Sequence, residues 1–430
     1  MSSSELVGAP YPPRAATKEI VFIRHAESQG NVDGLWHGRT DGPLSEAGVA
    51  SLDALRRRMA GWEFDYVISS PLTRARQTAA AVSDEVAINE DFVEMDVGRW
   101  EGLSFEESER AHAEEMRASF EDWTVAMGGT GESLADVGRR AYAAVDRVFA
   151  KLGKGQRAVV VTHGGLLQSL LHRHLPGKGR RVHPIAANTS ITRIIRQLGR
   201  PRLASFNDTG HLGSRSSTVN YHLRRGTPVL ALVRHGRTQA NTERRWQGHG
   251  DWDLDEVGVR QAEALGGWYG RVSKVYSSPL RRAMSTAEWV ASDGIVPIDG
   301  LKEMNMGEWE GLTSEEILEG WPSMMESIYR QGVDLRRGVT GESWGELTAR
   351  VSNTIAGIEA SAEEPTMVVA HGGAIRSYIS SLTATDDSYS ESLYTPANTS
   401  ISHIAMTSQG PELLDFSVAA HLELLDTAED

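Results

Sequence analysis

The chain repeats itself at an interval of about 210 residues. Six short blocks of its 430 residues recur in the same order, and the two members of each pair lie 208 to 210 positions apart. The pairs are residues 23–25 with 233–235, 69–72 with 277–280, 98–103 with 307–312, 130–133 with 340–343, 163–165 with 371–373, and 188–190 with 398–400. The interval is far too long for a solenoid repeat, so it predicts a duplicated domain that takes about half of the chain.

The limits of the two copies follow from the stretches that flank them. Residues 214–227 are polar and rich in Ser and Arg, and the first residues of the chain include Pro10, Pro12 and Pro13. We therefore predict a flexible N-terminal tail over residues 1–17, a first domain over 18–213, a linker over 214–227 and a second domain over 228–430.

Each copy alternates short apolar runs with longer helical patterns. Buried strands are predicted over residues 20–23, 66–68 and 158–161, and again over 229–233, 272–276 and 367–370. Ser70 and Ser278 each precede a proline, a pattern typical of a helix N-terminus with serine as its N-cap. This alternation favours an α/β fold in which each copy has a mostly parallel sheet flanked by helices.

The composition excludes several functions. The chain has no cysteine, which excludes disulfides, thiolate metal sites and a cysteine nucleophile. Its net charge is −14, and residues 216–430 carry all of the excess with 17 basic and 31 acidic side chains, so general binding of nucleic acid is not expected. The first residues lack a signal-peptide pattern and no apolar run reaches membrane-spanning length, so we expect a soluble cytoplasmic protein with no membrane partner.

Cationic side chains follow the predicted strands. Arg24 and His25 end the first strand, His163 ends the third, and Arg74 lies in the first turn of the helix after the second. Because ligands of open α/β sheets bind beyond the carboxyl ends of the strands, we expect these residues to meet at one edge. Two guanidiniums and a helix N-terminus together favour a dianion, most simply a phosphoryl group.

The same charges suggest how the chemistry proceeds. Nearby positive charge disfavours the imidazolium form, so a neutral His25 is a candidate nucleophile toward phosphorus. Glu94, in the loop before residues 98–103, is the candidate general acid for the leaving alcohol. The second copy repeats the set with Arg234, His235, Arg282, Glu303 and His371.

These motifs together resemble the histidine phosphatase superfamily, which has the phosphoglycerate mutase-like fold. The resemblance rests on residues 24–28 with Asn31, 70–75, 94–102 and 163–164, and independently on residues 234–238 with Asn241, 279–283, Glu303 and 371–372. It implies two tandem phosphoglycerate mutase-like domains that work through a phosphohistidine on His25 or His235. It further implies that Asn31 and Asn241 bind phosphate, that Glu94 and Glu303 serve as acid and then base, and that no metal and no cofactor take part.

Two departures from the mutases of this family favour hydrolysis. The mutases carry an insertion with basic residues and prolines after the acid loop, whereas residues 103–129 are short and acidic and contain no proline. The mutases also usually have tryptophan before the matched asparagine, where this chain has Gly30 and Ala240. We therefore expect a phosphoric monoester hydrolase of the histidine acid phosphatase type. A phosphoglycerate mutase-type phosphotransferase stays open, as does a chain with one catalytic domain and one that senses a phosphorylated ligand.

Positions around the predicted pocket differ between the copies and are candidates for substrate contacts. Ser28 corresponds to Thr238, Arg39 corresponds to a histidine, and the second copy adds Arg336 and Arg337 after its acid loop. These changes fit either different substrates or drift after duplication. The expected partner is a small phosphorylated molecule, and the sequence leaves homo-oligomerisation open.

One further motif indicates a different chemistry. Residues 341–345 match the Gly-x-Ser-x-Gly elbow of serine hydrolases, with Ser343 as the nucleophile. That elbow requires a preceding strand, and residues 334–340 lack a strand pattern. We therefore expect Ser343 to have another role.

Overall fold

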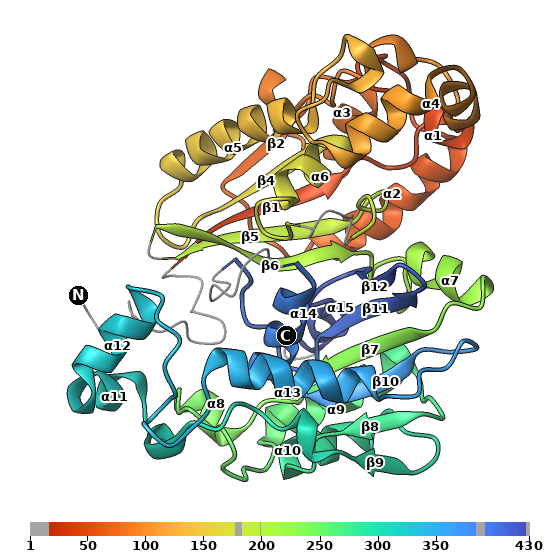
Figure 1. Cartoon of the computed structure of the whole chain (residues 1–430). Coiled ribbons are helices and arrows are strands. Elements are labelled where there is room, and N and C mark those ends of the chain that lie inside the picture. The colour runs from red at the N-terminus through yellow and green to blue at the C-terminus, as the bar shows by residue number, and fades with distance from the viewer. Residues whose placement is uncertain (1–16, 177–182, 198, 384–391, 427–430) are drawn as a thin grey trace. The chain divides into compact units, whose positions relative to one another are not determined.

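The computed structural model describes residues 17–176, 183–197, 199–383 and 392–426. The chain divides into two compact units (Figure 1): the first contains the described residues of 17–176 and 185–213, and the second contains those from 214 onward. The predicted tail over residues 1–17 lies outside the described residues except for Thr17, whose carbonyl oxygen accepts a hydrogen bond from the Gly155 amide.

Each unit holds a six-stranded mixed sheet, and the two sheets have the same strand order. The order is β3-β2-β4-β1-β5-β6 in the first unit and β9-β8-β10-β7-β11-β12 in the second. In the first sheet the four strands β3, β2, β4 and β1 are parallel to one another, whereas β5 pairs antiparallel with both β1 and β6. The second sheet has the same directions, so the predicted α/β fold with mostly parallel sheets is confirmed. The strands are β1 Lys18–Arg24, β2 Tyr66–Ser69, β3 Ala87–Ile88, β4 Arg157–Thr162, β5 Ile191–Gln197, β6 Arg200–Asp208, β7 Val229–Arg234, β8 Val275–Ser277, β9 Ile295–Pro297, β10 Thr366–Ala370, β11 Ile401–Thr407 and β12 Gly410–Leu413.

Helices cover both faces of the first sheet. Strand side chains alternate between the faces, and residues 20–23 of β1 are all fully buried. Val21 and Ile23 pack against Leu55 and Met59 of α2 and against the small residues of α3. The other face is covered by α5, which contacts β1 and packs on α6. The helical segments of this unit are α1 Gln29–Val32, α2 Glu46–Met59, α3 Thr73–Ala79, η3 Glu90–Phe92, η4 Gly98–Trp100, α4 Phe105–Glu121, η5 Met127–Gly129, α5 Leu134–Lys151 and α6 Gly164–Leu171.

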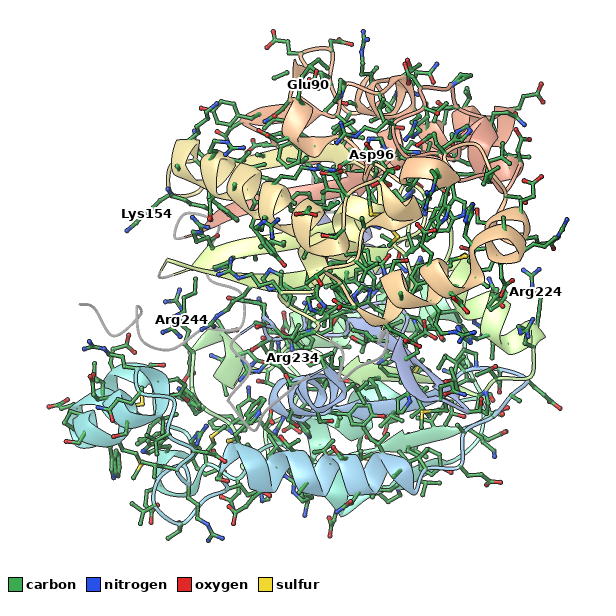
Figure 2. All side chains as sticks on the ribbon, turned by 45° about the horizontal axis from the view of Figure 1, so that its top comes forward. Glu90, Asp96, Lys154, Arg224, Arg234 and Arg244 are labelled. Atoms are coloured by element: carbon green, nitrogen blue, oxygen red, sulfur yellow. The ribbon has the colours of Figure 1, made fainter. Side chains whose placement is uncertain are left out.

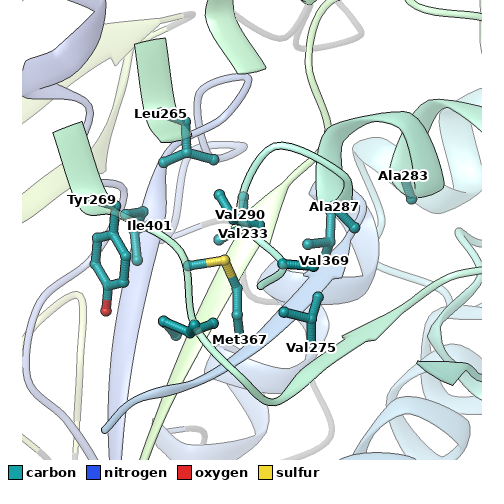
Figure 3. Close-up of a cluster of buried hydrophobic side chains, with 13 residues drawn as sticks. Val233, Leu265, Tyr269, Val275, Ala283, Ala287, Val290, Met367, Val369 and Ile401 are labelled. Atoms are coloured by element: carbon teal, nitrogen blue, oxygen red, sulfur yellow. The ribbon is translucent and has the colours of Figure 1, made fainter. Parts of the chain in front are cut away.

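The core of the second unit is built in the same way. Val233, Val275 and Val369 from three parallel strands pack against Leu265 of α9 and Ala287 of α10 (Figure 3). These side chains have almost no accessible surface, so the strands are packed rigidly and the residues at their ends have fixed positions. The helical segments are α7 Ser217–Arg224, α8 Gln239–Thr242, α9 Glu256–Tyr269, α10 Arg281–Ala287, η6 Asp299–Leu301, η7 Gly307–Trp309, α11 Ser314–Gly320, α12 Pro322–Tyr329, α13 Trp344–Ala356, α14 Gly372–Thr383 and α15 Ala420–Asp426.

The prediction that Ser70 and Ser278 are helix N-caps is wrong. Helix α3 begins at Thr73 with Leu72 as its N-cap residue, and α10 begins correspondingly one residue after Leu280. Each serine hydroxyl instead reaches the histidine that follows the neighbouring strand, at 2.7 Å in the first unit and 2.8 Å in the second. Each hydroxyl also accepts a hydrogen bond of 3.4 Å from the backbone amide two residues later, at Leu72 or Leu280, but the helix itself begins only after that residue.

Residues 214–227, predicted as a linker, contain the helix α7. Its Val219 is fully buried and packs with Val229, Ala405 and Leu414 of the second unit. In the part of the chain that the structure describes, no helix combines the length and the apolar character that crossing a membrane requires.

Candidate active site

The register of the parallel strands brings two histidines together in each unit. Arg24 is the partner of Thr162 across β1 and β4, so the next residues, His25 and His163, leave the sheet side by side. Their ring centroids lie 5.1 Å apart, and the rings of His235 and His371 repeat this distance in the second unit. The site therefore lies at the carboxyl ends of the strands, where ligands of such sheets bind.

The first histidine of each pair is oriented as a nucleophile. Nδ1 of His25 donates a hydrogen bond of 2.7 Å to the carbonyl oxygen of Ala26, and Nδ1 of His235 does the same to Gly236. Because a carbonyl oxygen only accepts, Nδ1 carries the proton and the lone pair of the neutral ring is on Nε2. Burial, together with the charges of the two site arginines, lowers the pKa of His25 and of His235 well below the usual 6.5. Both rings are therefore neutral at pH 7.

Two arginines hold the positive charge beside this ring. Nη1 of Arg24 donates to the carbonyl oxygen of Ala186 at 2.6 Å, and Arg74 donates to the carbonyl oxygens of Thr40 and Gly38 at 2.8 and 3.0 Å. Burial lowers the pKa of Arg24 to about 10, with Glu94 opposing the shift and Arg74 adding to it. Arg24 therefore stays cationic at neutral pH. Its buried Nε has no hydrogen-bond partner among the described residues, so a donor is left for an anion.

The second unit repeats these anchors. Arg234, labelled in Figure 2 at the end of β7, donates to the carbonyl oxygen of Pro396 at 2.7 Å. Arg282 donates to the carbonyl oxygens of Gly250 and Gly248, both at 2.8 Å, and burial lowers its pKa to about 10. These carbonyl partners carry no net charge and orient the guanidiniums, which together suit a phosphate dianion.

The second histidine of each pair is held by serine. Nε2 of His163 lies 2.7 Å from Oγ of Ser70, and burial, followed by the nearby cationic groups, lowers its pKa well below 6.5. In the second unit Nε of Arg282 donates to Nδ1 of His371 at 3.2 Å, so Nε2 of that ring donates to Ser278. Neutral His371 is therefore a hydrogen-bond donor whose orientation is fixed on both sides.

The candidate acid lies against the N-terminus of the helix that follows the second histidine. Glu94 accepts hydrogen bonds from the backbone amides of Met95, Gly165 and Leu166 at 2.8 to 2.9 Å. Glu303 makes the same three contacts at 2.8 to 3.0 Å. A Cβ atom on Gly165 would lie 2.8 Å from Oε1 of Glu94, so a side chain at this position would have to displace the carboxylate.

Glu101 holds the loop that supplies the carbonyl partners of Arg74. Its carboxylate accepts from the amides of Gly38, Arg39 and Thr40 at 3.0 to 3.2 Å. Glu310 accepts from His249 and Gly250 at 2.7 and 2.8 Å in the second unit. These two glutamates, which follow the tryptophan of the repeated block, thus stabilise the loop beside the site.

Asn31 and Asn241 are each linked to the first histidine of their unit through a second asparagine, Asn188 or Asn398. Asn188 donates to the carbonyl oxygen of His25 at 2.9 Å and to Oδ1 of Asn31 at 3.2 Å. The same Oδ1 accepts from the backbone amide of Ser28 at 3.2 Å. Since Oδ1 takes these bonds, the Nδ2 group is the part of Asn31 that can donate to an anion.

The predicted substrate-contact residues have different surroundings. Ser28 and Thr238 are buried and act as the N-caps of α1 and α8. Arg39 is half exposed and pairs with Glu132 at 3.2 Å. Arg336 is exposed and pairs with Glu346, whereas Arg337 is buried and donates to the carbonyl oxygen of Leu335.

Sequence reasoning missed one arginine in each unit. Arg140 of α5 and Arg350 of α13 contact the segments that carry Glu94 and Glu303. Their carboxylate partners, Glu132 and Glu342, stand in the repeated block at residues 130–133 and 340–343. The recurrence of both residues at an interval of 210 was the signal that could have found them.

The remaining motif has a structural role. Ser343 is the N-cap of α13, where its hydroxyl accepts from the backbone amide of Glu346, and no strand precedes it in the described stretch 334–342. Within the described ranges, no three His, Asp or Glu side chains are arranged to hold a metal ion.

The histidine phosphatase superfamily (branch 1) is the family whose model matches this sequence, first over residues 20–209 and again over 230–418. Phosphoglycerate mutase-like protein 4 of Arabidopsis thaliana is 34% identical over 180 residues, which are 40% of this chain and 77% of that protein. The adenosylcobalamin/alpha-ribazole phosphatase of Escherichia coli is 34% identical over 159 residues, 35% of this chain and 76% of that protein. The crystal structure of phosphoserine phosphatase from Entamoeba histolytica matches 45% of this chain and 99% of its own, with 29% identity and a TM-score of 0.40.

Proposed function

We propose that this chain, which belongs to the histidine phosphatase superfamily, is a phosphomonoesterase that hydrolyses small phosphate esters in both of its domains. One observation carries the proposal. In each unit a buried, neutral histidine with its lone pair on Nε2 lies near two guanidiniums that donate hydrogen bonds to backbone carbonyl oxygens. Such a site attracts a phosphate dianion and offers a nucleophile to its phosphorus.

The proposed reaction has two steps in the first domain. Nε2 of His25 attacks phosphorus, the bond from phosphorus to the leaving oxygen breaks, and Glu94 gives its proton to that oxygen. Water then attacks the phosphohistidine, Glu94 takes a proton from the water, and the P–N bond breaks to release inorganic phosphate. Arg24 and Arg74 stabilise the negative charge on the transferring oxygens in both steps. The second domain would proceed in the same way.

Glu94 must be protonated when the ester binds, because it donates in the first step. The N–H donors of Met95, Gly165 and Leu166 keep the group in place while its proton moves. After the first step the same group is a carboxylate and is ready to act as base.

Hydrolysis is favoured over mutase activity by the region after the acid loop. Helix α4 runs from Phe105 to Glu121, and its exposed side is acidic rather than basic. An acidic helix does not supply the additional anion contacts that a second phosphate group or a carboxylate on the substrate requires. The named activity of the Escherichia coli relative, a phosphatase, agrees with this proposal.

The test uses His25→Ala, His235→Ala and the double variant with an aryl phosphate as substrate. Each single variant should keep the turnover of the other domain, and the double variant should show none above the uncatalysed rate. Undiminished activity in the double variant refutes the proposal. Acid-labile phosphate trapped on only one of the two histidines would instead support one catalytic and one sensing domain. Phosphoglycerate isomerisation with a bisphosphorylated primer would support the mutase.

We also propose the domain limits, the cellular location, the independence of metals and the homo-oligomerisation that the sequence led us to consider. We retain residues 1–17 as a tail and domain limits of 18–213 and 228–430, and we propose that residues 214–227, predicted as a linker, belong to the second domain through helix α7. A cytoplasmic location, independence of metals and homo-oligomerisation are tested by fractionation, by activity in the presence of a chelator and by sedimentation.

A further inference from the structure

One arginine in each unit binds the backbone of the segment that carries the candidate acid. Nη1 of Arg140 donates to the carbonyl oxygens of Asp91 and Val93 at 3.0 and 2.8 Å, and Nη2 donates to that of Glu94 at 3.0 Å. The remaining donors of this guanidinium bind the two carboxylate oxygens of Glu132 at 2.7 and 3.0 Å. Arg140 therefore joins the acid segment to helix α5 through three hydrogen bonds, and two more hold its guanidinium on Glu132.

Glu132 holds the other end of the same segment. Besides Arg140, its Oε2 accepts from the backbone amide of Asp96 at 3.0 Å. The carbonyl oxygens of residues 91, 93 and 94 and the amide of residue 96 are thus all bound by one ion pair. Nothing within this pair touches the carboxyl group of Glu94, which points to the N-terminus of α6 instead.

We call the Arg140–Glu132 pair, with its contacts to the backbone on both sides of the acid, the bracket. The second unit has the same bracket, although the side chains of the bound segment differ. Arg350 donates to the carbonyl oxygens of Gly300, Lys302 and Glu303 at 2.9 to 3.0 Å. It also binds both oxygens of Glu342 at 2.7 Å, and Glu342 accepts from the Asn305 amide at 2.9 Å. Asp91, Val93 and Asp96 are replaced by Gly300, Lys302 and Asn305, which a bracket made only of backbone contacts permits.

The chemistry of the guanidinium explains why arginine is found here. Its planar fork presents five donors in fixed directions, so it can bind three carbonyl oxygens and a carboxylate at the same time. A general acid must lie within hydrogen-bond distance of the leaving oxygen, and a displacement of about 1 Å is enough to lose on the order of a hundredfold in rate. Backbone contacts on both sides of Glu94 restrict such displacements.

We propose that Arg140 and Arg350 are positioning residues that set the general acid, and thereby control how well each domain hydrolyses esters with poor leaving groups. The proposal rests on the proposed function. The hydrogen bonds of Arg140 go to the acid segment and to Glu132 rather than to His25, so its substitution should spare the attack on phosphorus and impair the protonation of the leaving oxygen.

The experiment compares two substrates in full-length protein with the second domain silenced by His235→Ala. Ethyl phosphate needs a proton on its leaving oxygen, whereas 2,4-dinitrophenyl phosphate loses a stable phenolate without one. For Arg140→Gln we expect kcat/KM to fall on the order of a hundredfold for ethyl phosphate and by about threefold or less for the dinitrophenyl ester. Arg140→Lys, which keeps the charge but loses the fork, should fall between parent and Arg140→Gln on ethyl phosphate. The matched control is Arg139→Gln on the exposed side of the same helix, where Arg139 pairs with Asp136, and it should match the parent.

Equal losses on the two esters, or no loss, would overturn the proposal, because either result shows that Arg140 does not act through the leaving group. If Arg140→Gln melts at a much lower temperature than the parent, Glu132→Gln takes its place in the comparison. This substitution keeps the size of the side chain and weakens only the contacts that Glu132 makes. A smaller loss confined to ethyl phosphate supports the bracket. A parent that hydrolyses neither ester would refute the proposed function itself, which distinguishes the two failures. Arg350→Gln in the His25→Ala background repeats the test for the second domain.

Discussion

The protonation state of the nucleophile leads to a prediction about pH. Burial and the charges of Arg24 and Arg74 lower the pKa of His25 well below 6.5, and His235 is shifted in the same direction by the same causes. Only the neutral ring can attack phosphorus. Lowering this pKa moves the loss of the neutral form to lower pH, so acidification from pH 8 to pH 5 should leave the nucleophile active.

The size of the effect follows from the unperturbed value. A histidine with a pKa near 6.5 is only about 3% neutral at pH 5, so a nucleophile of that kind would lose roughly thirtyfold in kcat/KM between pH 8 and pH 5. For His25 we expect a loss of about threefold or less over the same range, after correction for the substrate.

The assay is kcat/KM of the His235→Ala protein with an aryl phosphate, so that only His25 contributes. Each rate is divided by the fraction of substrate present as dianion, because phosphate monoesters themselves titrate near pH 6 in round numbers. Ring proton resonances of His25, identified by their loss in His25→Asn, provide an independent measure. They should not shift between pH 8 and pH 5, whereas free imidazole in the same sample should titrate.

A thirtyfold loss of corrected kcat/KM, with His25 resonances that titrate near 6.5, would show that the guanidiniums and the burial do not act as argued. The parallel experiment on His235 in the His25→Ala protein should give the same result. A difference between the two domains would contradict this reasoning, because burial and two arginines lower the pKa of the histidine in both.

Three further predictions concern stability and geometry. Burial lowers the pKa of His211 to about 4, so the unfolded chain takes up a proton at higher pH than the folded chain does. Acidification from pH 8 to pH 5 should therefore lower the free energy of unfolding by about 2 kcal/mol. In urea titrations of His211→Gln, this part of the pH dependence should be absent. Gly165→Ala would place a Cβ 2.8 Å from Oε1 of Glu94, and we expect at least about a tenfold lower kcat/KM for an alkyl phosphate at nearly unchanged melting temperature. Ser70→Ala leaves a buried ring nitrogen of His163 without its partner and should cost about 1–3 kcal/mol in urea unfolding, together with a measurable loss of kcat; wild-type values in both measurements would contradict the assigned contact.

Much of the fold follows from local pattern. Apolar runs such as residues 20–23 and 158–161 are buried on both faces, and this is why they are recognisable as central parallel strands without knowledge of their partners. The antiparallel strands β5 and β6 were not predicted. They carry charged side chains, and Arg193 of β5 pairs with Glu19 of β1, 174 positions away in sequence. No local pattern contains that information.

The candidate site shows the same division. The residue types that carry the chemistry stand at the ends of recognisable strands, so their convergence could be predicted from the topology of parallel sheets alone. The contacts that orient them could not. Ser70 was assigned to a helix terminus on local grounds, whereas its hydroxyl meets His163, 93 positions away. Arg140 recurs as Arg350 at the interval of the duplication, but only the folded chain shows that it binds the segment of Glu94.

The sequence by itself determined the duplication, the alternation of three buried strands with helices in each copy, and the set of cationic and acidic side chains that each copy presents at the end of its sheet. Only the tertiary structure decided which ring nitrogen of His25 carries the proton and why the ring is neutral. The tautomer depends on a hydrogen bond to the backbone of Ala26, and the pKa depends on burial and on charges that arrive from different strands and helices. Both are properties of a packed environment, which exists only after residues far apart in the chain have been brought together.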